Sequence, residues 1–230
     1  MRNRVSVKLN LNRETLVDRI VEILENRILS GELAPGSKLS ELLVANEFGV
    51  SRSPAREALQ RLEKMGLVRK TLLGREVAKF SLKEFREIYE LKNVVEAFGA
   101  MKGSLNATNL EIKKIQSIIN DMAKSLNLGE LKKVKYLNYQ FHDSLVKCSR
   151  NQKLIETYIL LVKQIRWATS FSFDLPGRPQ QSLSEHLAIF EAFKQGEAEK
   201  VRSLLEIHSY NNMERTLAQI KYKERKKDSL

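Results

Sequence analysis

The stretch FGVSRSPAREALQRLEKMGLV, residues 48–68, decides how the first third of the chain folds. Ser51 is of a residue type that begins helices, and Pro54 follows in the first turn, where its missing N–H costs nothing. The helix that begins here ends at Gly66, a residue type common just beyond helix ends. Its core-facing side chains recur at helical spacing and are Ala55, Ala58, Leu59 and Leu62.

Two more helices are expected before this stretch and a hairpin after it. Apolar residues at helical spacing predict helices over 14–30 and 40–47, each followed by a glycine. A turn at Leu73-Gly74-Arg75 separates two strand-like runs, expected at 67–70 and 76–80. Three helices followed by a two-stranded hairpin predict a winged helix-turn-helix over residues 14–80.

The face of the third helix that points away from this core is polar and basic. Arg52, Arg56 and Gln60 stack at intervals of four residues, and Arg and Gln pair with guanine and adenine edges, respectively. The helix N-terminus favours phosphate, and a basic hairpin tip suits the minor groove. The predicted DNA-binding residues are Ser51, Arg52, Ser53, Arg56, Gln60, Gly74 and Arg75. An ordinary solvated helix face is the alternative interpretation.

Composition narrows the class of protein. The 230 residues carry a net charge of +12, which favours a polyanionic partner, either nucleic acid or an acidic membrane surface. No apolar run approaches the ~18 residues that span a bilayer, so no membrane insertion is expected. The single Cys148 and the absence of a secretory signal fit a cytoplasmic protein. Residues 1–13 are interpreted as a flexible basic arm.

After Phe80 the sequence predicts only helices. They are expected at about 82–102, 109–126, 130–148, 152–173, 183–195 and 198–222, followed by a basic, fraying tail at 223–230. Capping boxes are expected for the pairs Ser81/Glu84, Thr108/Glu111 and Ser182/Glu185. The predicted fold is therefore mainly α, with a winged helix-turn-helix followed by an all-α helical bundle over 81–222.

The three histidines of the chain, His142, His186 and His208, each lie on the apolar stripe of a predicted helix. A buried imidazole needs a partner, and one shared metal satisfies all three. Three separate core histidines, each with its own hydrogen bond, are the alternative. A metal-dependent enzyme is another hypothesis. Glu185, however, points about 100° away from His186 around its helix, so the sequence places no general base beside the histidines.

The N-terminal motifs resemble the GntR family of bacterial transcription regulators. The similarity covers about 60 residues, from GELAPGSKL (31–39) through FGVSRSPAREAL (48–59) to GREV (74–77). It implies that Arg52 and Arg56 contact bases and that Gly74 lies at the wing tip. Ala55 stands where the family usually has Val or Leu, and Leu42 where some members have an Arg.

The second half resembles the FCD ligand-binding domain over about 81–215. The resemblance implies a divalent metal (zinc, nickel or manganese) held by Asn138, His142, His186 and His208, with Asn138 in place of the usual Asp and hence weaker binding. It also implies a small organic acid as effector. Lys92 stands where the family commonly has an Arg. It keeps the positive charge but cannot bind a carboxylate through two N–H groups at once, as Arg does. The candidate effector-binding residues are Lys92, Arg166, Ser170 and Asn212, with Trp167 beside them.

These expectations combine into a homodimeric repressor. Its two recognition helices would read a palindromic operator in double-stranded DNA, and a small carboxylate effector would shift that affinity. The alternatives are a metal-dependent enzyme that uses the three histidines and a basic protein that binds DNA without sequence preference.

Overall fold

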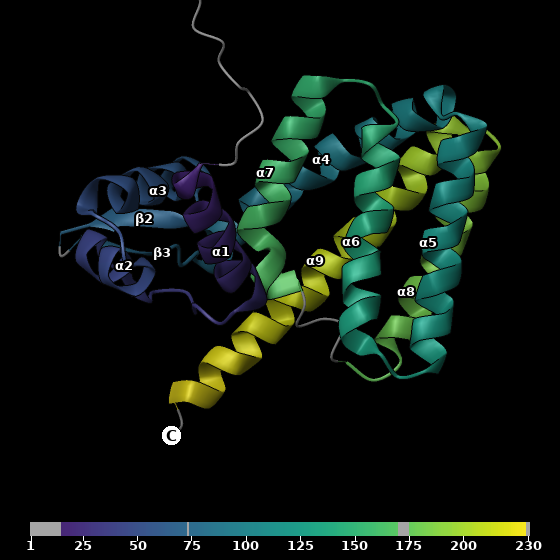
Figure 1. Cartoon of the computed structure of the whole chain (residues 1–230). Helices are drawn as coiled ribbons and strands as arrows, with labels where there is room; N and C mark the ends of the chain where they lie inside the picture. The colour runs from purple at the N-terminus through teal and green to yellow at the C-terminus, as the bar shows by residue number, and fades with distance from the viewer. Residues whose placement is uncertain (1–14, 73, 170–174, 229–230) are drawn as a thin grey trace, which may run out of the picture. The chain divides into compact units, whose positions relative to one another are not determined.

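A computed structural model describes residues 15–72, 74–169 and 175–228 and divides the chain into two compact units, Met1–Lys79 and Phe80–Leu230 (Figure 1). The predicted basic arm at 1–13 lies outside the described residues. Among the described residues, no helix is long and apolar enough to cross a membrane.

The N-terminal unit contains three helices and a small antiparallel sheet. The sheet has three strands in the order β1-β3-β2, whereas the sequence predicted only a two-stranded hairpin. The additional strand pairs Lys38 with Glu76, and its two residues are too few to show an alternating pattern. The elements are α1 (Leu16–Ser30), β1 (Lys38–Leu39), α2 (Glu41–Phe48), α3 (Arg52–Lys64), β2 (Val68–Thr71) and β3 (Gly74–Val77).

Local caps fix the ends of these helices. The Thr15 side chain accepts from the N–H of Asp18 and the Asp18 carboxylate accepts from that of Thr15, which satisfies two otherwise unpaired donors. Ser51 is the N-cap of α3, as predicted, although its side chain caps no backbone N–H. Gly49 ends α2 with φ 64°, a left-handed conformation that favours glycine.

The core of this unit lies where α1 and α2 pack on α3. The four residues predicted to face it, Ala55, Ala58, Leu59 and Leu62, are all 0% exposed. Ile20 and Leu24 of α1 and Val44 of α2 join the same cluster. The predicted inner and outer faces of α3 are therefore confirmed, and the outer face is available to a ligand.

The C-terminal unit consists of helices, as predicted. Figure 1 shows α5 and α6 side by side, and α4 packs along α9. A Cβ on Gly103 of α4 would lie 2.4 Å from the Leu145 carbonyl oxygen of α6, so only glycine allows this approach. The helices are α4 (Leu82–Asn106), α5 (Asn109–Asn127), α6 (Leu131–Lys147), α7 (Gln152–Thr169), α8 (Arg178–Lys194) and α9 (Ala198–Asp228).

Several predicted boundaries were wrong. The second strand of the hairpin was expected at 76–80 but spans Gly74–Val77, and α4 was expected to end at about 102 but ends at Asn106. The Ser182/Glu185 capping box does not form, because α8 begins at Arg178 with Pro179 in its first turn, and Ser182 is buried inside the helix. The last helix was expected to end at 222, but α9 continues to Asp228, because no Gly or Pro follows Gly196. The capping boxes at Ser81 and Thr108 are confirmed.

Candidate functional site

The outer face of α3 presents the predicted DNA-reading residues to solvent. Ser51, Arg52, Ser53 and Gln60 are exposed, and each follows from the register that buries the alanines and leucines of the same helix. Arg56 is also exposed, but its Nε lies 3.1 Å from both carboxylate oxygens of Glu41. Its ion pair is open to water, so the partner can be exchanged for a phosphate or a base at low cost.

Arg75 does not lie at the hairpin tip. It stands opposite Lys70 in the ladder between β2 and β3, two residues beyond the turn. Its side chain is 17% exposed, and it donates from Nε to Glu63 over 3.1 Å and from Nη1 to Glu41 over 3.2 Å. Arg75 therefore braces the wing, the β2–β3 hairpin, against α2 and α3.

Gly74 begins β3 opposite Thr71, with φ 128° and open space where a side chain would stand. Leu73, beside it in the predicted tip, lies outside the described residues. The exposed glycine leaves the backbone of the wing open to close approach by a duplex.

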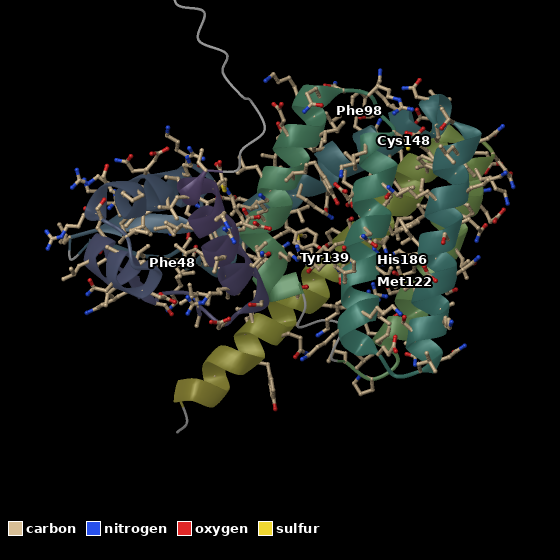
Figure 2. All side chains as sticks on the ribbon, viewed as in Figure 1. Phe48, Phe98, Met122, Tyr139, Cys148 and His186 are labelled. Atoms are coloured by element: carbon tan, nitrogen blue, oxygen red, sulfur yellow. The ribbon has the colours of Figure 1, made fainter. Side chains whose placement is uncertain are left out.

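The three histidines come together from three helices. His142 of α6, His186 of α8 and His208 of α9 offer ring nitrogens that all lie within 4.8 Å of one another. They are 7%, 0% and 5% exposed, so the cluster is inside the C-terminal unit, where Figure 2 labels His186. The juxtaposition predicted from three apolar stripes is present in the fold.

Several polar atoms in this cluster lack hydrogen-bond partners. Among the residues that the structure describes, neither ring nitrogen of His186 has one, and neither does the buried Oδ1 of Asn138, one turn before His142. Burial, with the neighbouring charges of His208 and His142, holds the pKa of His186 well below its usual value. Burial likewise lowers the pKa of His208 to about 4. Neutral imidazoles and an amide oxygen are suitable ligands, so these residues fit a divalent metal.

Two carboxylates contact the cluster, one buried (Glu96) and one half-buried (Glu185). Glu185 Oε2 accepts from His208 Nδ1 at 2.6 Å, and Glu96 Oε1 lies 2.8 Å from His142 Nδ1, although the angle there does not suit a hydrogen bond. Burial opposes their charge, but Lys92 holds the pKa of Glu96 well below its usual value, and His208 lowers that of Glu185. Such carboxylates orient metal-ligating rings and leave Nε2 free. The sequence analysis missed both roles, because only the tertiary fold brings these side chains to the histidines.

A cavity of about 530 Å³, part of it open to solvent, adjoins the histidines. Lys92 and Asn212, two predicted effector residues, line it. Lys92 Nζ is bound to Glu96 and to Ser209 Oγ, the latter over 3.2 Å, and Asn212 donates to Tyr89 Oη over 3.0 Å. Further lining residues are Lys135, Asn138, Tyr139, His142, Tyr158, Val162, Ile165 and His208.

The remaining predicted effector residues differ in their placement. The Arg166 guanidinium lies 4.3 Å from the centroid of the Tyr139 ring, a cation–π contact, and Arg166 is not among the residues that line the cavity. Ser170 and the side chain of Trp167 lie outside the described part of the structure. The cavity thus brings together two of the four predicted effector residues.

Comparison with known proteins identifies both units. The profile of the FCD domain matches residues 87–211, and that of the bacterial regulatory proteins of the gntR family matches residues 16–71. Among solved structures, Escherichia coli McbR/YncC superposes with a TM-score of 0.78 at 18% identity, covering 90% of this chain and 100% of that one, which supports the fold.

Sequence relatives agree with the two profiles. The HTH-type transcriptional repressor RspR of Escherichia coli (strain K12) is 27% identical over 209 residues, 89% of this chain and 90% of that protein. The gluconate operon transcriptional repressor of Bacillus licheniformis is 31% identical over 153 residues, 66% of this chain and 60% of that protein. These relatives are transcription regulators, not enzymes. The chain belongs to the GntR family of bacterial transcription regulators, in the group whose second domain is an FCD domain.

Proposed function

We propose that this regulator is a repressor whose affinity for its operator is set by a small carboxylate bound beside a divalent metal in the C-terminal unit. The observation that carries the proposal is His186, fully buried with both ring nitrogens lacking a partner, between two other histidines. A structural core histidine would hydrogen-bond. Two relatives carry the word repressor in their names, and one of them is named for a gluconate operon.

For DNA, the proposal assigns base contacts to α3. Arg52 and Ser53 are exposed at the N-terminus of α3 and Gln60 two turns further along, and Arg56 joins them when it exchanges Glu41 for DNA. Ser51 and the first N–H groups of α3 bind phosphate. Gly74 lets the wing approach the backbone. Arg75 supports the wing and reaches the minor groove only if it leaves its two glutamates.

For the metal, the proposal assigns His142, His186, His208 and the amide oxygen of Asn138 as ligands. When bound, zinc, nickel or manganese supplies positive charge and open positions for carboxylate or hydroxyl oxygens. Glu185 holds the His208 ring in the orientation that ligation needs, and Glu96 places a negative charge 2.8 Å from His142 Nδ1. Asn138 contributes no charge, so the affinity is lower than an aspartate would give.

For the effector, the proposal uses the cavity beside the histidines. Lys92 supplies a cation and Asn212 an amide at its wall. Arg166 belongs to the effector site only if it leaves the Tyr139 ring, and Ser170 keeps its predicted role. A ligand that joins several helices shifts their packing, and a coupling of about 1–3 kcal/mol to DNA affinity is typical.

For the quaternary structure, the proposal is a homodimer joined along α4. Leu91, Val94, Phe98 and Leu105 are 51%, 66%, 42% and 65% exposed, and their spacing of three, four and seven residues is that of a coiled-coil stripe. Figure 2 labels Phe98. A self-complementary stripe suits a second copy related by a two-fold axis, which matches a palindromic operator. Val94→Glu is expected to yield a monomer with weak operator binding, as measured by light scattering and fluorescence anisotropy.

Anisotropy titrations at fixed salt test the whole proposal. Labelled palindromic DNA from beside the protein's own gene is compared with a shuffled duplex, with the metal content of the purified protein measured first. We expect tight, sequence-specific binding that weakens when metal and a small carboxylate are both added. Equal affinity for both duplexes would identify a basic protein without sequence preference and refute the proposal.

A further inference from the structure

Two arginines in the C-terminal unit have buried nitrogens that receive no acceptor from the described residues. Arg178, at the start of α8, is 3% exposed, yet its Nε and Nη1 have no hydrogen-bond partner. Nη1 of Arg215 in α9 is also buried without one. A charged donor without an acceptor is costly to bury, so these three nitrogens favour an anion from outside the chain.

The rest of the Arg178 guanidinium is fixed. Its Nη2 donates to Glu185 Oε2 over 3.1 Å, and the same oxygen accepts from His208 Nδ1. Glu185 therefore satisfies one nitrogen of Arg178 and positions the others. Arginine commonly binds a carboxylate through two N–H groups at once, so a second carboxylate is a suitable acceptor for Nε and Nη1.

The two guanidinium groups act on each other. Burial lowers the pKa of Arg178, and the charge of Arg215 acts in the same direction, so the groups lie within electrostatic reach. The charge of Arg178 also reaches Tyr89, which lines the cavity and accepts from Asn212. Two cations within electrostatic reach of each other are stabilised by an anion between them.

The distance from Arg215 to the histidines limits the length of the ligand. Arg215 follows His208 by seven residues, with Asn212 between them on the same face, which is about 10 Å along α9 at 1.5 Å per residue. A monocarboxylate bound at the histidines is too short to cover that length, whereas an acyclic diacid of four or five carbons reaches toward Arg215.

We infer that Arg178 and Arg215 bind the second carboxylate of the effector, so that the regulator recognises a short dicarboxylate rather than a monocarboxylate. This inference rests on the proposed function, which places the first carboxylate beside the histidines. It adds the Arg178–Arg215 pair to the candidate effector-binding residues.

Isothermal titration of the metal-loaded, full-length protein tests the inference with matched acids. Succinate is compared with butyrate, and malate with 2-hydroxybutyrate, so that each pair differs by one carboxylate. Wild type is expected to bind each diacid about ten- to a hundredfold more tightly, the ratio for one added charge-assisted contact. In Arg215→Gln this ratio is expected to fall to about one, with monoacid affinity unchanged.

Two controls keep the result interpretable. Arg202→Gln removes the same charge from α9 at the surface, where Arg202 pairs with Glu206, and is expected to keep the wild-type ratio. Arg178→Lys keeps the charge toward Glu185 but loses the guanidinium fork, so the ratio is expected to fall while metal content stays the same.

The outcomes separate this inference from the proposed function. Equal binding of diacids and monoacids by wild type, or an equal loss of both in Arg215→Gln, would overturn the inference alone. If sulfate raises the Tm of wild type as much as succinate does, the Arg178–Arg215 pair binds an inorganic anion. This result would also overturn the inference. Absence of binding by any carboxylate would refute the proposed effector class, and the inference with it.

Discussion

His186→Leu separates a metal-binding histidine from a structural one. The side chain is 0% exposed, and both of its ring nitrogens are buried without a partner. Each such atom costs about 1–3 kcal/mol, and leucine removes both while keeping a similar volume. Imperfect packing offsets part of this gain, so the metal-free variant is expected to be more stable than metal-free wild type by about 1 kcal/mol. That corresponds to about 2–4 °C in Tm for a chain of this size.

The same variant is expected to lose the response to metal. At a free metal concentration about 100 times its Kd, wild type gains about 2.7 kcal/mol, which the variant lacks. Thermal unfolding of chelator-treated protein, with and without added zinc, nickel or manganese, measures both effects.

His208→Leu is the matched control for this experiment. His208 is equally buried but donates to Glu185, so its replacement leaves the carboxylate without that partner and should destabilise the metal-free protein. A metal-free His186→Leu protein less stable than wild type, with an unchanged metal response, would refute the reasoning.

The other predictions concern metal affinity, DNA reading and pH. Asn138→Asp adds a charged ligand and should tighten metal binding about 10- to 100-fold, measured by competition with a chromophoric chelator; unchanged affinity would remove Asn138 from the ligand set. Arg52→Ala should cost about 1–3 kcal/mol of discrimination at one base pair in anisotropy titrations, while Arg202→Ala leaves it intact. Because the pKa of His208 falls from 6.5 to about 4 on folding, the unfolded chain binds more protons between these values. The metal-free protein should therefore lose stability as pH decreases from 6.5 toward 4, and a denaturant series in which His208→Leu shows the same slope as wild type would contradict this.

Sequence patterns predicted what depends on local geometry. The inward face of α3 and the capping boxes at Ser81 and Thr108 depend on residues three or four apart, and these are confirmed. The convergence of the three histidines also followed, since a residue on an apolar stripe points to the shared core. By contrast, the two-residue β1 strand and the start of α8 carried too little periodic signal.

Pairs that are distant in the sequence were beyond prediction. Arg75 was assigned to the wing tip, but its guanidinium is held by Glu41 of α2 and Glu63 of α3. Glu185 was interpreted as a helix cap. Its bond to His208 follows only from the packing of α8 on α9, and its ion pair with Arg178, two turns earlier in α8, depends on a helix start that the sequence did not predict. Carboxylates at helical spacing are usually solvated, so nothing in the sequence marked Glu41, Glu63 or Glu185 as partners of distant side chains.

One buried network connects the proposed metal and effector sites. Glu96 contacts Lys92, which lines the cavity, and lies beside His142 in the histidine cluster. A carboxylate that pairs with Lys92 changes the electrostatic potential at Glu96 and at the His142 ring beside it. A cation bound to that ring in turn changes the electrostatic potential at Lys92. The coupling free energy is the same in both directions, so a metal that strengthens effector binding must itself be bound more tightly when the effector is present. Under the proposed function, metal content and effector affinity are therefore two readouts of one equilibrium, and Glu96 is the residue that lies between the two sites.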